Sequence, residues 1–202
     1  MLFRILLACF LSALLCASST NSVAYGKTVE AKAELVRLQF EIDKLTRRNA
    51  WKGVERTYNA MLDLELELRP VDHMAGEYAA RNRGDINIAY ARLQEAIPSG
   101  SNLENEAEPN LREAILRKTS IETRYGLVKL EVQQGRIPAL VRFEWPFARD
   151  ERVCIETSRT TLGEERKYEG FLPIGKYMID GKFFEVSPGL DLLDLVISPP
   201  EN

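Results

Sequence analysis

Apolar side chains recur at spacings of three and four through most of the first 120 residues, a pattern that predicts amphipathic helices. The first helix is expected over residues 28–48, with an apolar stripe formed by Ala31, Leu35, Leu38, Ile42 and Leu45. The next stripe is formed by Trp51, Val54, Tyr58 and Met61, and Asn49 is expected to cap that helix. The short joint predicts an antiparallel pair.

A second helical hairpin is expected between Val71 and Ile97. Pro70 suits a first helical position, Gly84 suits a left-handed helix end, and Asp85 offers an oxygen to cap the following helix. The stripe of that helix is formed by Ile86, Ala89, Leu93 and Ala96. After a break at residues 98–102, Pro109 is expected to begin a last helix, and the period changes at Tyr125-Gly126.

From Leu127 onward apolar and polar residues alternate, which predicts half-buried strands. The inward residues expected for four strands are Val128, Leu130 and Val132; Val141, Phe143 and Trp145; Val153 and Ile155; and Leu193, Leu195 and Ile197. Short strands separated by turn signals predict a β-sandwich or an open barrel.

The sequence Asp180-Gly181 predicts a two-residue type I′ turn in a β-hairpin. The turn pairs Met178 with Phe183 and Tyr177 with Phe184, so Met178 and Phe183 are expected on the outer face. We expect the last helix, near Leu111 and Ile115, to cover them.

The spacing of Gly84, Asp85, Ala89, Leu93 and Ala96 resembles the turn and second helix of a tetratricopeptide repeat, and Trp51, Val54 and Tyr58 resemble the start of another. The pattern departs from the family at Glu55, Glu77 and Ala80. The resemblance implies a role in binding other proteins. A plain helical bundle without a groove in use is the alternative.

Residues 170–189, GFLPIGKYMIDGKFFEVSPG, resemble the closing part of PEGA-type, immunoglobulin-like or transthyretin-like surface modules. That resemblance implies a noncatalytic β-sandwich of an exported bacterial protein.

Arg4, the apolar run from Ile5 to Leu15 and the small residues ending at Ala24 have the layout of a secretory signal peptide. The expected segments are a signal peptide (1–24), a helical domain (25–123) and a β-sandwich domain (124–202). A retained membrane anchor is an alternative, although the run is shorter than the ~20 residues that span a bilayer. A lipid anchor at Cys16 or Cys9 is another, but neither cysteine has a suitable preceding sequence.

The composition and the absence of known motifs argue against several classes of function. The 202 residues include 27 basic and 30 acidic side chains, with no basic tract for a phosphate backbone, so nucleic acid is not an expected partner. His73 is the only histidine and is expected at the surface or as a cap, and Cys154 is the only cysteine outside the signal peptide. We find no P-loop or dinucleotide motif. No catalytic, cofactor or metal residues are therefore assigned.

These observations predict an α+β protein, with helical hairpins followed by an antiparallel β-sandwich. The expected function is that of a noncatalytic, exported envelope protein, periplasmic or extracellular, that binds another envelope protein. The candidate interaction surface comprises Trp51, Tyr58, Tyr78, Met178 and Phe183. The alternative is a module that binds cell-wall glycan, with Trp145, Phe147 and Tyr168 as an aromatic platform. A hydrolase is a further alternative, because two carboxylates can meet from anywhere in the chain.

Overall fold

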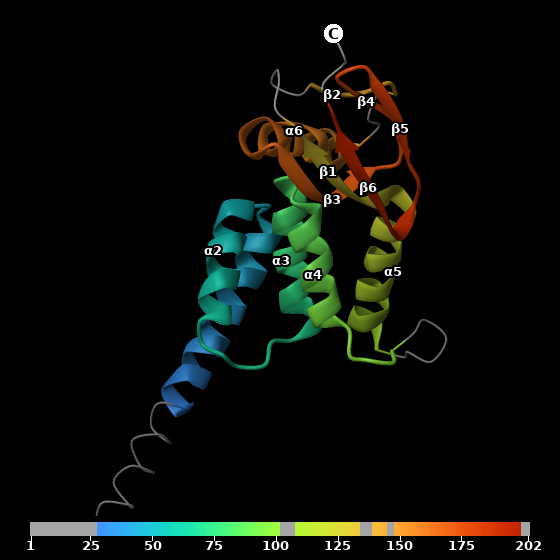
Figure 1. The fold of residues 1–202 in the computed structure, drawn as a ribbon. Helices are drawn as coiled ribbons and strands as arrows, with labels where there is room; N and C mark the ends of the chain where they lie inside the picture. The colour runs from blue at the N-terminus through green and yellow to red at the C-terminus, as the bar shows by residue number, and fades with distance from the viewer. Residues whose placement is uncertain (1–27, 102–107, 134–138, 145–147, 199–202) are drawn as a thin grey trace, which may run out of the picture.

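The computed structural model describes residues 28–101, 108–133, 139–144 and 148–198, and it has an α+β fold (Figure 1). The helical half comprises a helix over residues 28–47, α2 (Trp51–Leu62), α3 (Pro70–Asn82), α4 (Ile86–Ala96) and α5 (Pro109–Arg124). The second half comprises β1 (Tyr125–Val132), β2 (Leu140–Arg142), α6 (Arg149–Glu165), β3 (Lys167–Pro173), β4 (Gly175–Ile179), β5 (Lys182–Val186) and β6 (Gly189–Ile197). The predicted α+β class is confirmed. The predicted signal peptide, residues 1–24, lies outside the described residues.

The helix ends follow the local sequence. Gly84 takes a left-handed conformation (φ 77°), and the Asp85 side chain accepts a hydrogen bond from the N–H of Ile88 at 3.3 Å, as predicted. Pro70 and Pro109 each occupy a first helical position. The prediction that Asn49 caps α2 is wrong. Asn49 is itself left-handed (φ 54°), so the cap position falls on Ala50, which has no side-chain oxygen.

The helical half contains two apolar clusters. One joins the N-terminal helix to α2 and α3 through Leu35, Leu38, Ile42, Val54, Tyr58, Met61 and Ala79. The other joins α3, α4 and α5 and continues into the strands through Met74, Ala80, Ile86, Ala89, Tyr90, Leu93, Ala96, Ala114, Ile121, Tyr125, Cys154 and Phe171. The predicted stripes are therefore the faces that the helices bury. Figure 1 shows α2 to α5 side by side, with the strands at one end of the layer.

The second half holds two three-stranded sheets, with strand orders β3-β1-β6 and β2-β4-β5. All pairs are antiparallel except β1 with β6, which is parallel, so the expectation of an antiparallel arrangement fails for that pair. The two sheets share one core, formed by Val128, Leu130, Val132, Leu140, Leu162, Tyr168, Leu172, Tyr177, Ile179, Val186 and Ile197. The β-sandwich remains a prediction.

One predicted strand is a helix. Val153 and Ile155 lie in α6, whose buried residues Glu151, Cys154, Ile155, Ser158 and Leu162 recur at spacings of three and four. The alternation at residues 152–156 was too short to tell the two periods apart. Leu162 enters the core shared by the sheets, and Cys154 enters the core shared with the helices.

The β4–β5 hairpin has the predicted register, with Met178 opposite Phe183 and positive φ at both Asp180 and Gly181. The expectation that α5 covers its outer face is wrong, because Phe183 is 70% exposed. The expected inward position of Phe143 is also wrong. Leu140 is the buried residue of β2, Phe143 is 53% exposed, and Trp145 lies outside the described residues.

The two halves meet where the α3–α4 turn lies on α6. A Cβ atom at Gly84 would be 2.5 Å from the carbonyl carbon of Val153 and 2.6 Å from the nitrogen of Cys154. One turn further on, the Asn87 side chain accepts a hydrogen bond from the N–H of Phe171 at 2.9 Å. At Gly84 the junction therefore includes a close backbone contact that only a glycine permits.

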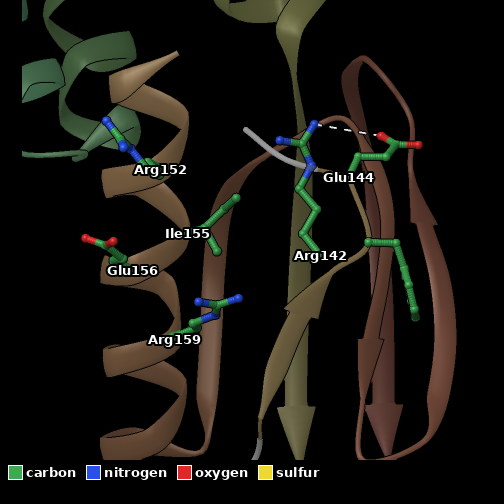
Figure 2. Close-up of a pocket in the computed structure, with 7 residues that line it drawn as sticks. Arg142, Glu144, Arg152, Ile155, Glu156 and Arg159 are labelled. Carbon is green, nitrogen blue, oxygen red and sulfur yellow. Dashed lines mark ion pairs between the residues drawn. The ribbon is translucent and has the colours of Figure 1, made fainter. Parts of the chain in front are cut away.

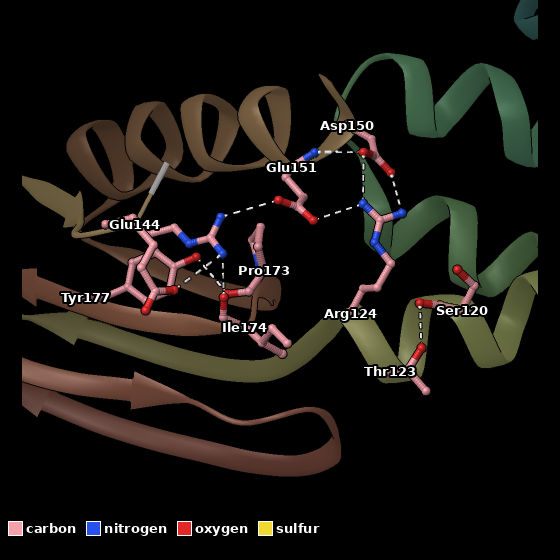
Figure 3. Close-up of polar contacts among 10 residues, drawn as sticks. Ser120, Thr123, Arg124, Glu144, Asp150, Glu151, Pro173, Ile174 and Tyr177 are labelled. Atoms are coloured by element: carbon pink, nitrogen blue, oxygen red, sulfur yellow. Dashed lines mark hydrogen bonds and ion pairs between the residues drawn. The ribbon is translucent and has the colours of Figure 1, made fainter. Parts of the chain in front are cut away.

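A polar network closes the same junction (Figure 3). Arg124, at the end of α5, pairs with Asp150 at 3.3 Å and Glu151 at 2.9 Å. Glu151 also accepts a hydrogen bond from Arg142 of β2 at 3.4 Å, and Arg142 donates to the carbonyl of Ile174 at 2.7 Å. Glu151 thus connects the last helix of one half to a strand of the other.

Gly84→Ala is expected to destabilise the protein far more than Gly100→Ala, because both glycines are left-handed but only Gly84 lacks space for a Cβ atom. Gly100→Ala is expected to lower the free energy of unfolding by about 1 kcal/mol through backbone strain alone. Gly84→Ala is expected to cost about 2 kcal/mol more through overpacking against α6. Urea unfolding measures both, and equal losses would contradict the proposed contact.

Candidate functional site

A groove with a volume of about 460 Å³ lies between the C-terminal end of the N-terminal helix, the start of α2, and helices α3 and α5. Its residues are Asp43, Thr46, Arg47, Asn49, Trp51, Val71, Met74, Ala75, Tyr78 and Arg117. Apolar side chains of α3 and two aromatic rings line it together with charged groups from the N-terminal helix and α5. Such a mixed lining is typical of a binding site for a ligand with an apolar group.

Two neighbouring side chains hold the Tyr78 ring of the groove in place. The rings of Trp51 and Tyr78 stack with their centroids 5.2 Å apart, and the guanidinium of Arg117 lies 4.8 Å from the centroid of the Tyr78 ring. Tyr78 nevertheless remains 40% exposed. A ring that is fixed and accessible loses little conformational entropy when a partner packs against it.

Arg117 is itself positioned by a buried carboxylate. Glu77 is fully buried and accepts a hydrogen bond from Arg117 at 2.9 Å, while Arg81 forms an ion pair with it at 2.6 Å. Glu113 of α5 pairs with the other side of Arg117 at 2.8 Å. A buried carboxylate is costly unless positively charged groups pair with it. The ion pair between Glu77 and Arg117 therefore holds α3 against α5 next to the groove.

A second ion pair ties α2 to α4. Arg92 donates two hydrogen bonds to Glu55, at 2.7 and 2.8 Å, and one to the carbonyl of Gly76 at 2.6 Å. Arg92 also lies 4.4 Å from the centroid of the Tyr58 ring. Gly76 brings α3 close to that ring, because a Cβ atom there would be 2.8 Å from it.

His73 is buried, so its expected place at the surface is wrong. Its Nδ1 and the hydroxyl of Tyr58 share a hydrogen bond of 2.9 Å. Burial lowers the pKa of His73, and the nearby positive charge of Arg92 lowers it further, although Glu95 and Asp72 oppose the shift. Burial also raises the pKa of Tyr58 to about 12. The hydrogen-bonded pair of His73 and Tyr58 therefore belongs to the core of the helical half and not to its surface.

The structure separates the five residues of the predicted interaction surface. Trp51 and Tyr78 lie together in the groove, whereas Met178 and Phe183 lie on the β4–β5 hairpin. Tyr58 is only 1% exposed, so assigning it to the surface was wrong. Its helical stripe faces the core, and its spacing from Trp51 predicts burial as readily as exposure. Arg117 was missed because it belongs to a different helix.

Phe183 forms a second exposed surface with Phe143. The two rings stack with centroids 5.5 Å apart. They border a shallow depression of about 480 Å³, whose residues are Phe143, Lys176, Tyr177, Phe183, Phe184 and Glu185. Tyr168, predicted as part of an aromatic platform, is instead buried and donates a hydrogen bond to the carbonyl of Phe171 at 2.8 Å. Trp145 and Phe147 lie outside the described residues.

A smaller cleft of about 270 Å³ lies between α6 and β2 (Figure 2). Arg142, Arg152 and Arg159 line it, but Glu144 and Glu156 line it too. Arg159 donates its Nε hydrogen to the carbonyl of Leu140 at 2.6 Å. Arg142 already donates hydrogen bonds to Glu151 and to the carbonyl of Ile174. Two of the three arginines thus form hydrogen bonds within the protein, so we do not assign a ligand to the cleft.

Cys154 has no features of a reactive thiol. It is buried in α6, burial raises its pKa to about 12, and its thiol donates a hydrogen bond to the carbonyl of Phe171 at 3.3 Å. Within the described residues, no group of three or more His, Cys, Asp or Glu side chains is placed to hold a metal ion. None of the helices in the described part of the chain is both long enough and apolar enough to cross a membrane.

Because His73 is the only histidine, it can be tested by stability measurements between pH 7.5 and 5.5. Its pKa is lower in the folded than in the unfolded protein, so the folded state favours neutral His73. Its contribution is therefore present above the unfolded pKa, near 6.5, and is lost as the pH falls toward the folded pKa. The free energy of unfolding should fall over this range, and less steeply in His73→Asn. Parallel pH profiles would contradict this assignment.

No family model matches the chain, and no curated protein or solved structure matches it either. The resemblances to tetratricopeptide repeats and to PEGA-type modules therefore remain predictions from sequence.

Proposed function

We propose that this protein is a noncatalytic, exported envelope protein that binds a polypeptide segment of another envelope protein in the groove of its helical half. The observation that carries the proposal is Tyr78, whose ring stacks with Trp51, lies against the guanidinium of Arg117 and is still accessible. Rigid aromatic rings beside arginines are typical of the residues that dominate binding energy in protein interfaces. The export part of the proposal rests on the sequence of residues 1–24.

The lining of the groove suggests the chemistry of the bound segment. Val71, Met74 and Ala75 offer an apolar surface beside the two rings, so the segment is expected to insert an apolar or aromatic side chain. Asp43 and Arg47 lie at the groove on the N-terminal helix, and Asp43 also acts on the charge of nearby Arg69. Charged residues flanking the apolar anchor would complement them.

Selection of peptides from a random library on the immobilised protein tests this proposal. Selected peptides are expected to carry an apolar anchor and to bind Tyr78→Ala about tenfold more weakly or worse, because one central aromatic contact is lost. Phe183→Ala is the matched control, since it removes an exposed ring that lies on β5 and does not line the groove. Equal binding to wild-type protein and Tyr78→Ala would refute the groove as the site.

A second candidate function is glycan binding by the β half, and the stacked, exposed pair of Phe143 and Phe183 favours it. Flat aromatic surfaces with polar neighbours suit sugar rings, and Lys176 and Glu185 lie beside this pair. This surface replaces the platform predicted from Trp145, Phe147 and Tyr168.

Sedimentation with insoluble peptidoglycan, followed by measurement of the unbound protein, separates the two candidates. If the second is correct, Phe183→Ala should reduce binding about tenfold, whereas Tyr78→Ala should leave it unchanged. The opposite dependence, or no binding by the wild type, would exclude glycan binding through this surface.

A further inference from the structure

The first sheet, with strand order β3-β1-β6, has two outer edges, and the edge of β3 is covered by a side chain of the helical half. Asn87 of α4 accepts a hydrogen bond from the N–H of Phe171 at 2.9 Å and donates one to the carbonyl of Glu169 at 3.4 Å. The amide group of Asn87 thus takes the place of a further strand. An edge covered in this way is protected from pairing with another chain.

The outer edge of β6 has a different and smaller cover. From Leu193 to Ile197 the strand pairs regularly with β1, and the carbonyl of Ile197 accepts a hydrogen bond from the N–H of Gln133, just beyond β1. Because successive residues point their backbone groups to opposite edges, those of Asp194 and Val196 face outward. Among the described residues, the one hydrogen bond to this outer edge comes from Lys182 of β5, which donates to the carbonyl of Val196 at 3.2 Å.

The sequence and exposure of β6 are typical of a strand that pairs with other chains. It is nine residues long, contains neither proline nor lysine, and exposes about half of each of the side chains of Leu190, Leu192 and Val196. Apolar strands with an unpaired edge are templates for further strands. Such an edge is also complementary to itself, because two copies can run antiparallel about a two-fold axis.

We propose that Lys182 protects this edge and prevents two copies of the chain from pairing through β6. Its ammonium group occupies the Val196 carbonyl, which is one of the groups that an added strand would use. An added strand would separate the ammonium from its acceptor and remove it from water without a new partner, which is unfavourable. Lysines at strand edges are a common protection against such pairing. The proposal is independent of the groove, which neither Lys182 nor β6 lines.

Sedimentation velocity over a range of protein concentrations tests the proposal, in about 0.5 M salt so that repulsion between the aspartates of different copies is screened. The wild type is expected to stay monomeric. Lys182→Met keeps an apolar stem but loses the charge, so its apparent dissociation constant for self-association should be at least about tenfold lower. Lys182→Arg should behave like the wild type, because a guanidinium can donate the same hydrogen bond. Circular dichroism and urea unfolding should be unchanged in both variants, since Lys182 is exposed.

Lys176→Met is the matched control. Lys176 is an exposed lysine of β4, and its replacement adds the same apolar side chain beside the exposed rings of Phe143 and Phe183. This variant should stay monomeric. If it associates as strongly as Lys182→Met, any added apolar side chain is sufficient and the proposal is wrong.

Amide hydrogen exchange identifies the surface through which Lys182→Met associates. The outward N–H groups of Asp194 and Val196 should exchange rapidly in the wild type and become protected in associated Lys182→Met, whereas that of Phe171 should be protected in both. Adding Asp194→Pro removes one outward N–H and should return Lys182→Met to a monomer. A Lys182→Met chain that is no more associated than the wild type, or that associates without protecting these two amides, would overturn the proposal.

Discussion

The close approach of Gly84 to the backbone of α6 governs how the helices meet the strands. Because no Cβ atom separates them, α4 begins directly against α6, and Asn87 then reaches the backbone of β3. Tyr90, one turn further along α4, packs against Phe171 with ring centroids 5.0 Å apart. The apolar cluster of α3 to α5 thus continues into the strands without a linker, and the groove and the exposed hairpin belong to one packed body.

Two residues that depart from the tetratricopeptide pattern form ion pairs between helices. Glu55 and Glu77 stand where that family favours small residues, and each pairs with an arginine of another helix, Arg92 and Arg117 respectively. Close packing is supplied one position away, by Gly76 against Tyr58. Buried ion pairs add less to stability than apolar packing of similar volume, but they penalise any arrangement that separates the partners. They favour one register between the helices, and therefore one shape of the groove.

Local signals in the sequence determined most of the helix boundaries and the β4–β5 hairpin. Gly84-Asp85 and Asp180-Gly181 each require a particular backbone conformation, so a few residues suffice to predict them. Other features depend on distant contacts. Nothing near Val153 distinguishes a short strand from the start of α6, and no local pattern pairs β6 with β1 in parallel. The groove was half predicted, because Trp51 and Tyr78 stand out as aromatics, whereas Arg117 enters only when α5 packs on α3.

The pairing order of the first sheet sets a condition on how the chain folds. β1 is the central strand, and its two neighbours, β3 and β6, follow it by about 40 and 60 residues along the chain. As the chain grows, the helices can pack from local contacts, whereas β1 must wait with one edge unpaired until β6 has been made. The last nine-residue strand, Gly189–Ile197, therefore completes the sheet. A chain that lost its C-terminal end would leave the free edge of β1 open to pairing with strands of other molecules.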